Sequence, residues 1–188
     1  MERIVDMVEH QVIAAVRSEE ELAEALGSRV NVIFLLMGSI GNLQELVTKV
    51  RDSGRRVFVH LDFIEGIASD RSGVQYIANH IHPDGILSTR NHLIGMAKEN
   101  GMKAIQRLFL IDSTAIRNGM KAIRSSGADA VEIMPGLMPK VIRELTEMTE
   151  LPIIAGGLIR EEEEVHEALK AGALAVSVGE PDLWQMKL

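Results

Sequence analysis

The sequence predicts an α/β fold, a compact (βα)8 TIM-type barrel of eight parallel strands with a helix after each. Short β-branched runs alternate along the whole chain with stretches that carry apolar residues at helical spacing. Dividing 188 residues among eight such units leaves about 23 residues for each, which accommodates a strand, a helix and two tight loops. No linker or shift of composition interrupts this pattern, so we expect one domain over residues 1–188. An open doubly wound sheet has the same alternation, and periodicity alone does not exclude it.

Eight apolar runs are the candidate strands. Each is short and rich in aliphatic residues, as expected of parallel strands that are buried on both faces. The runs are Val12–Val16, Val32–Met37, Val57–Phe63, Gly85–Leu87, Ile105–Ile111, Ala130–Met134, Pro152–Ala155 and Leu174–Val178.

Helical patterns and their end signals lie between these runs. Residues 43–50 and 141–148 have the i, i+3, i+4 apolar spacing of an amphipathic helix. Ser18 precedes a Glu-rich first turn and is typical of an N-cap. Glycines stand near the predicted helix ends, where a left-handed C-cap is favourable: Gly54, Gly101, Gly127 and Gly172.

Composition excludes several classes of protein. The chain has no cysteine, so disulfides, thiol nucleophiles and Cys-ligated metals are excluded. Residues 1–10 lack the layout of a signal peptide, and no apolar run approaches the roughly 20 residues of a membrane span, so we expect a cytoplasmic protein. We expect no metal site either, because His80 and His82 precede the fourth strand, at the end of the barrel that serves stability.

Charged residues lie in or directly after the third, fifth and sixth predicted strands, and barrels place their functional groups toward the C-terminal ends of strands. His60 and Asp62 are two apart, so strand alternation points both toward the barrel axis, with Glu65 on the following loop. Arg107 lies in the fifth run and Glu132 in the sixth. These charges predict a polar ligand site, or a buried ion pair of Arg107 with Asp62 or Glu132, and the two are compatible.

Glycines end the seventh and eighth predicted strands. Gly156, Gly157 and Gly179 would let backbone N–H groups approach an anion closely. This position is the usual phosphate site of TIM barrels, although the same glycines also suit tight βα turns.

The residues after the eighth strand include one that favours a phosphate site and two that disfavour it. Pro181 suits the first turn of an additional short helix, as the phosphate site requires. The carboxylates of Glu180 and Asp182 disfavour a neighbouring phosphate unless they point away from it.

Six segments, taken in order, resemble the glycerol-3-phosphate-responsive antiterminator family over nearly the whole chain. Individually they are modest motifs, but as an ordered set at predicted strand ends they are specific. The segments are VIAAVR (residues 12–17), HLDFIEG (60–66), GILSTR (85–90), IQRLFLIDS (105–113), EIMPG (132–136) and PIIAGGLI (152–159).

The resemblance implies a regulator that senses glycerol 3-phosphate as its effector, without a cofactor. It further implies that the protein acts on leader mRNA of glycerol-utilisation genes and prevents premature termination of transcription. The acidic stretch 180–182 departs from the family pattern, which is richer there in hydroxyl and basic residues. Carried onto this chain, phosphate is expected at Gly156, Gly157 and Gly179. The positions of the polar strand ends, and not the resemblance, put Asp62, Glu65, Arg107 and Glu132 nearer the glycerol part.

Two basic clusters are candidates for contact with RNA, although the net charge of −7 does not favour nucleic-acid binding. Either cluster is also compatible with an ordinary solvated surface. One consists of Arg117, Lys121 and Arg124 on one helical face, and the other of Arg51, Arg55 and Arg56.

An enzyme acting on a small phosphorylated metabolite is the alternative to a regulator. Asp62, Glu65 and Glu132 would then supply acid–base chemistry, for an isomerase, a lyase or a phosphodiesterase.

A regulator that responds to its ligand through a dimer equilibrium would also be a homo-oligomer.

Overall fold

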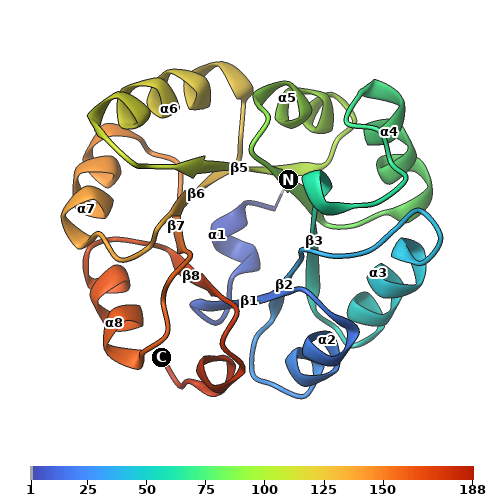
Figure 1. Cartoon of the computed structure of the whole chain (residues 1–188), viewed down its shortest axis with the longest axis horizontal. Coiled ribbons are helices and arrows are strands. Elements are labelled where there is room, and N and C mark those ends of the chain that lie inside the picture. The colour runs from blue at the N-terminus through green and yellow to red at the C-terminus, as the bar shows by residue number, and fades with distance from the viewer. Residues whose placement is uncertain (1) are drawn as a thin grey trace.

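Eight parallel strands close into a barrel in chain order, with β8 paired to β1 (Figure 1). The structure is a computed structural model that describes residues 2–188. Closure confirms the predicted TIM-type barrel and excludes the open sheet. The strands are β1 (Val12–Val16), β2 (Val32–Leu35), β3 (Arg56–His60), β4 (Gly85–Ser88), β5 (Lys103–Phe109), β6 (Ala130–Met134), β7 (Ile153–Gly156) and β8 (Ala175–Val178).

Helices surround the barrel and cover the outer face of every strand (Figure 1). Short irregular helices add a 3₁₀ turn after β3, a π-helical end to α4 and a 3₁₀ turn after β8. The α-helices are α1 (Ile4–Met7), α2 (Glu19–Leu26), α3 (Leu43–Asp52), α4 (Arg71–Tyr76), α5 (Asn91–Glu99), α6 (Ser113–Ser126), α7 (Pro139–Met148) and α8 (Glu162–Lys170); the others are η1 (Leu61–Phe63), η2 (Ile77–Ile81) and η3 (Pro181–Gln185).

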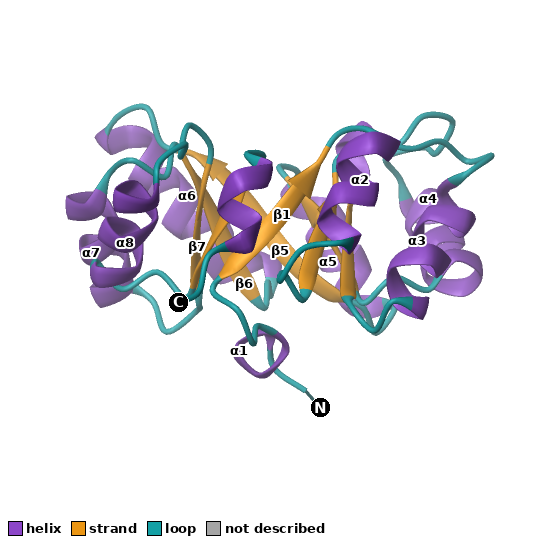
Figure 2. Ribbon diagram, turned by 90° about the horizontal axis from the view of Figure 1, so that it is seen from below, coloured by secondary structure: helices purple, strands orange, loops and turns teal. Residues whose placement is uncertain are grey.

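Helix α1 closes the N-terminal end of the barrel. It lies below the strands in Figure 2, and its Ile4 and Met7 are buried against the apolar interior of the barrel. Because this end is plugged, access to the interior is left to the opposite end, where the C-terminal ends of the strands meet.

The predicted helix caps are confirmed. The Ser18 hydroxyl accepts a hydrogen bond from the backbone N–H of Glu21 at 3.1 Å and begins α2. Gly127 ends α6 with φ 69°, a left-handed conformation that a side chain would strain. The three other predicted cap glycines also have positive φ.

Inward-facing side chains stack in layers of four that odd and even strands contribute alternately. The two lower layers are apolar and include Ile13, Phe58 and Ile105. Toward the C-terminal ends the layers become polar. Strand alternation places Phe34, Leu87, Glu132 and Ser177 in one layer, and Ala15, His60, Arg107 and Gly156 in the layer above it.

The third and fifth predicted strands were too long at their C-terminal ends. Strand β3 ends at His60, and the chain then tightens into η1, so strand alternation does not orient Asp62. The prediction that Asp62 lies on the strand was therefore wrong. Its carboxylate instead accepts hydrogen bonds from Ser88 and Thr89, which follow the neighbouring strand. Strand β5 ends at Phe109, which leaves Ile111 exposed on the loop.

Candidate functional site

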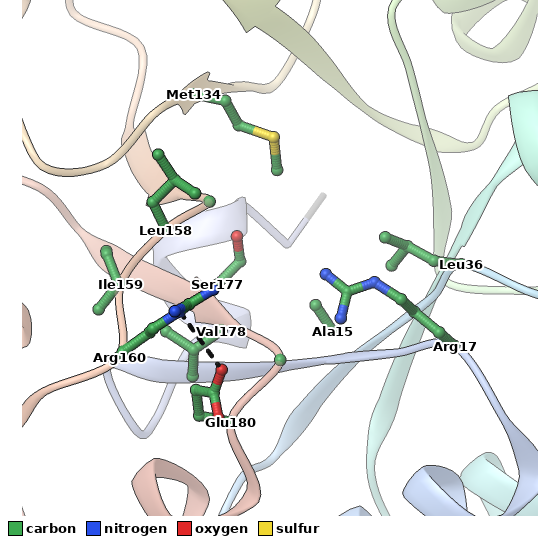
Figure 3. Close-up of a pocket in the computed structure, with 12 residues that line it drawn as sticks. Ala15, Arg17, Leu36, Met134, Leu158, Ile159, Arg160, Ser177, Val178 and Glu180 are labelled. Atoms are coloured by element: carbon green, nitrogen blue, oxygen red, sulfur yellow. Dashed lines mark ion pairs between the residues drawn. The ribbon is translucent and has the colours of Figure 1, made fainter.

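A cavity of about 200 Å³ opens at the C-terminal ends of β7, β8 and β1 (Figure 3). Two of the predicted glycines, Gly157 and Gly179, line it. Its floor includes Ala15 and Ser177, and Met134 stands at its rim. The position is the one that the glycine-rich strand ends predict for a phosphate.

Arg17 brings a guanidinium to this cavity from the end of β1. Closure of the barrel sets β1 beside β8, and a Cβ added at Gly179 would lie 2.6 Å from Nη1 of Arg17. Only a glycine at position 179 therefore leaves this guanidinium its place. Within residues 2–188 the Arg17 side chain forms no ion pair, so its charge is available to a ligand. In the sequence Arg17 stood out only as the last residue of the segment VIAAVR.

Glu180 is directed to a cation on the opposite wall. Its Oε1 lies 3.9 Å from Nε of Arg160, and Figure 3 shows this pair on the side of the cavity away from Arg17. Pro181 begins the predicted additional helix, which is the 3₁₀ turn η3. Trp184 anchors this turn, because its indole N–H donates to the carbonyl of Val178 at 2.9 Å. The Glu180 carboxylate thus forms a solvent-exposed ion pair with Arg160 at the edge of the site.

A buried polar network lies directly beneath the cavity. Nε of Arg107 donates to Oε2 of Glu132 at 2.5 Å, and the Ser177 hydroxyl donates to Oε1 of Glu132 at 2.5 Å. Arg107 is 4% exposed and Glu132 is fully buried. The predicted ion pair of Arg107 is therefore made with Glu132. Since Ser177 also lines the cavity, the network connects the cavity to the barrel axis.

Gly156 leaves room for this network. A Cβ added at Gly156 would lie 2.9 Å from Oε1 of Glu132 and would also collide with the Ser177 hydroxyl. The residue lies one step deeper than Gly157, whose φ of 76° turns the chain along the cavity wall. The small residue at position 156 is thus explained by the packing of Glu132.

Asp62 is held as a carboxylate on the β3–β4 side of the mouth. The Ser88 hydroxyl donates to it at 2.8 Å, and the N–H and hydroxyl of Thr89 each donate at 2.9 Å. Partial burial works against the charged form, but these hydrogen bonds outweigh it and lower the pKa of Asp62.

His60 lies beside Asp62 and faces the barrel axis. Burial, followed by the charge of Arg107, lowers the pKa of His60 to about 3, so the ring is neutral at physiological pH. Neither ring nitrogen has a hydrogen-bond partner among residues 2–188.

Glu65 lies apart from the cavity. Its backbone joins the loops after β2 and β3, through Glu65 N–H to the Gly38 carbonyl at 3.0 Å and Ile40 N–H to the Glu65 carbonyl at 2.8 Å. Its side chain is exposed, and neither Glu65 nor Asp62 is among the residues that line the cavity.

The two basic clusters differ in how their side chains are used. Arg55 donates to the carbonyls of Ser28 and Val30, and Arg56 pairs with Glu2 and Asp84. Arg51 donates to the carbonyl of His82, so this cluster is tied into the barrel's own structure. The cluster on α6 is exposed instead, and α6 contains no acidic residue; it consists of Arg117, Lys121 and Arg124.

Three further observations concern the described part of the chain. His80 and His82 precede β4, at the stability end of the barrel, as predicted. Over residues 2–188, no group of three or more His, Asp or Glu side chains is placed to hold a metal ion. None of the described helices combines the length and the apolar character that crossing a membrane requires.

Comparison with known proteins identifies the family. The family model described as "Glycerol-3-phosphate responsive antiterminator" matches residues 12–184. YgcP, an uncharacterized protein of Escherichia coli K12, is 35% identical over 178 residues, which cover 95% of this chain and 93% of YgcP.

Two solved structures agree with this match. The glycerol uptake operon antiterminator regulatory protein of Listeria monocytogenes is 33% identical, with a TM-score of 0.90 over 94% of this chain and 95% of that chain. A glycerol uptake operon antiterminator-related protein of Thermotoga maritima is 34% identical, with a TM-score of 0.83 over 93% and 98% of the two chains. The chain therefore belongs to the family of glycerol-3-phosphate-responsive antiterminators.

Proposed function

We propose that this protein is a cytoplasmic transcription antiterminator that binds glycerol 3-phosphate in the cavity at the ends of β7 and β8 and then binds leader mRNA. The observation that carries the proposal is the unpaired guanidinium of Arg17 facing a glycine-lined wall, in a family described by its response to a phosphate ester. Glycerol 3-phosphate is the effector in this proposal, and no cofactor takes part.

The phosphate would lie between Arg17 and the backbone of Gly157 and Gly179. A guanidinium presents paired N–H donors that match two phosphate oxygens. Glycines let a phosphate approach the main chain without contacting a Cβ. Gly156 would contribute by keeping Glu132 and Ser177 in place beneath the phosphate.

The glycerol part would extend toward the barrel axis. Ser177 leads from the cavity to Glu132 and Arg107, whose polar groups suit hydroxyls. Asp62 would border this space from the β3 side, where it contacts the loop after β4. Glu65 would lie outermost, on the loop after β3, which pairs with the loop after β2.

Helix α6 offers the surface that suits RNA. The helix has no acidic residue, and its basic side chains would contact RNA phosphates; they are Arg117, Lys121 and Arg124. Directly before α6, the side chains of Phe109 and Ile111 are 58% and 86% exposed. Exposed aromatic rings and basic side chains occur together in proteins that bind single-stranded nucleic acid, because nucleobases stack on the rings.

Strand β5 would couple the two sites. Arg107, in the network under the cavity, is two residues from Phe109, and the loop between β5 and α6 follows at once. A ligand that contacts Arg107 would therefore act on the segment that carries the RNA surface. It shifts the balance of two states only by binding one of them more tightly. A change of dimer equilibrium would be one such response.

The titratable groups favour a sensor over an enzyme. A general acid or base for chemistry near pH 7 works best with a pKa near 7. The pKa of Asp62 is lowered instead, and that of His60 falls to about 3. The carboxylate of Glu132 is already bonded to Arg107 and Ser177.

The proposal is tested by titrating leader RNA with the protein, with and without glycerol 3-phosphate, at several salt concentrations. We expect tighter binding with the ligand and a log–log decrease of affinity with salt. Equal affinity with and without ligand, together with no salt dependence, would exclude an RNA-binding regulator. Sedimentation of the same samples reports whether the ligand changes the oligomeric state.

A further inference from the structure

Two polar side chains under the cavity have atoms without partners. Nδ1 and Nε2 of His60, and Nη2 of Arg107, form no hydrogen bond to any residue in the range 2–188. His60 is 1% exposed and Arg107 is 4% exposed. Buried polar atoms are nearly always paired in folded proteins, because an unpaired one has given up its hydrogen bonds to water. Such atoms at the end of a ligand site indicate that a ligand group completes them.

Both side chains lie in the same layer at the C-terminal end of the barrel interior. Strand alternation puts His60 on β3 and Arg107 on β5 in the top layer of the barrel, together with Ala15, which lines the cavity. The His60 ring is held edge-on by Phe63, with the ring centroids 4.5 Å apart. Neither His60 nor Arg107 lines the cavity itself, and Ala15 connects their layer to it.

The surroundings of His60 determine which of its nitrogens carries the proton. Oδ2 of Asp62 lies 3.8 Å from Nδ1, and no other carboxylate within residues 2–188 is this close to the ring. A neutral imidazole has one N–H and one lone pair, and a neighbouring carboxylate favours the proton on the nearer nitrogen. Nδ1 is then protonated, and Nε2 presents its lone pair.

The charge of Arg107 is already balanced. Its Nε donates to the Glu132 carboxylate, so Nη2 presents N–H donors without an excess of positive charge. This layer thus offers N–H donors on Arg107 and one acceptor on His60. A group that satisfies both must accept one hydrogen bond and donate another.

We propose that His60 and Arg107 form a subsite for a neutral hydroxyl, which accepts a hydrogen bond from Nη2 of Arg107 and donates one to Nε2 of His60. A carboxylate has no proton to donate, so it would meet the Nε2 lone pair unfavourably. A methyl group would leave both partners unpaired and dehydrated. This subsite makes the sensor specific for phosphate esters that end in an alcohol. It rests on the proposed function, which places the phosphate at the other end of the ligand.

Three ligands with the same phosphate separate the possibilities. Calorimetric titration of the full chain would compare glycerol 3-phosphate with propyl phosphate, which lacks hydroxyls, and with 3-phosphoglycerate, which ends in a carboxylate. We expect glycerol 3-phosphate to bind at least about tenfold more tightly than either analogue, the effect of a buried polar group left unpaired. His60→Phe should reduce this preference to less than about twofold. His60→Gln, which retains an acceptor, should keep most of it.

Each outcome either supports or overturns the hydroxyl subsite. Equal binding of the three ligands by the unchanged protein would overturn the hydroxyl subsite and leave the phosphate site standing. A His60→Phe variant that keeps the full preference would show that a water molecule, and not the ligand, completes His60. If no phosphate ester binds, the proposed function fails, and the subsite fails with it. Should His60→Phe not fold, as judged by circular dichroism, the ligand comparison on the unchanged protein and on His60→Gln still decides.

Discussion

Arg107 and Glu132 stand directly opposite each other in the register of β5 and β6, and their side chains form an ion pair inside the barrel. Below this level the barrel interior is apolar, and above it the cavity opens. A buried ion pair is a poor source of stability, because both ions lose their hydration. Its place between core and cavity instead makes the C-terminal end of the barrel a polar site.

Breaking this pair should destabilise the protein. Glu132→Gln leaves the buried guanidinium of Arg107 without its counter-charge, and we expect a loss of about 3–5 kcal/mol in the free energy of unfolding. Urea denaturation measures it. Arg71→Gln is the matched control, because Arg71 pairs with Glu99 on the exposed surface and should cost at most about 1 kcal/mol. Equal losses for the two variants would contradict the burial assigned to the Arg107–Glu132 pair.

Gly179→Ala should weaken ligand binding with little effect on stability. The added methyl group would lie 2.6 Å from Nη1 of Arg17, which is the mobile end of a long side chain and can move away. The guanidinium then leaves the cavity wall, and we expect the affinity for glycerol 3-phosphate to fall about tenfold, as for a lost charge-assisted hydrogen bond. Gly95→Ala on α5, where an added Cβ meets nothing within 4 Å, is the control and should bind normally. Unchanged affinity in Gly179→Ala would separate Arg17 from the ligand.

His60 should make the protein less stable as the pH falls from about 6.5. The ring has an ordinary pKa of about 6.5 in the unfolded chain and about 3 in the fold, where burial and then the charge of Arg107 oppose protonation. Between these values the unfolded chain binds more protons than the folded one. The free energy of unfolding therefore decreases as the pH falls, by at most about 1.4 kcal/mol per pH unit. From pH 7 to pH 5 this gives a loss of up to about 2 kcal/mol by urea denaturation.

Two variants assign this loss to His60. His60→Phe should remove most of the dependence between pH 7 and pH 5. His166→Gln, at an exposed position on α8, should retain it. The lowered pKa of Asp62 acts in the same direction, but only below about pH 4, where its carboxylate begins to take up a proton in the unfolded chain. A pH dependence that survives in His60→Phe would show that His60 is not buried as a neutral ring.

Replacing the basic side chains of α6 should weaken RNA binding, because electrostatic contacts with phosphates are lost. The triple variant Arg117→Ala, Lys121→Ala, Arg124→Ala loses up to three phosphate contacts, so the slope of log affinity against log salt should fall by about two to three. Glycerol 3-phosphate should still bind, because these residues do not line the cavity. A control variant on α7, Lys140→Ala with Arg143→Ala, should leave the slope unchanged, and an equal effect of both would argue against a specific RNA surface on α6.

The sequence predicted the elements of the barrel well because their signals are local. The run Ala130–Met134 is bounded as predicted, and glycines such as Gly127 end helices where the pattern breaks. Orientation at strand ends was harder to predict. Asp62 does not follow the strand alternation. Its carboxylate accepts hydrogen bonds from the Ser88 hydroxyl and the Thr89 N–H instead.

Contacts made by closure of the barrel were not accessible from periodicity. Arg17 and Gly179 are at opposite ends of the chain and meet only because β1 pairs with β8. The bond from Ser177 to Glu132 depends in the same way on layers that form when the barrel closes. Alternation from the inward-facing Ala175 was the one signal that marked Ser177 as an interior residue.

Thermal unfolding with glycerol 3-phosphate tests most directly that this barrel is a phosphate-ester sensor whose site contains Arg17. At about 100 times its dissociation constant the ligand adds about 2.7 kcal/mol of stability, which raises Tm by about 5–10 °C in a chain of this length. Glycerol and inorganic phosphate at the same concentration should raise it less, and Arg17→Ala should lose most of the shift. An unchanged Tm with glycerol 3-phosphate, or an equal shift in Arg17→Ala, would contradict the account.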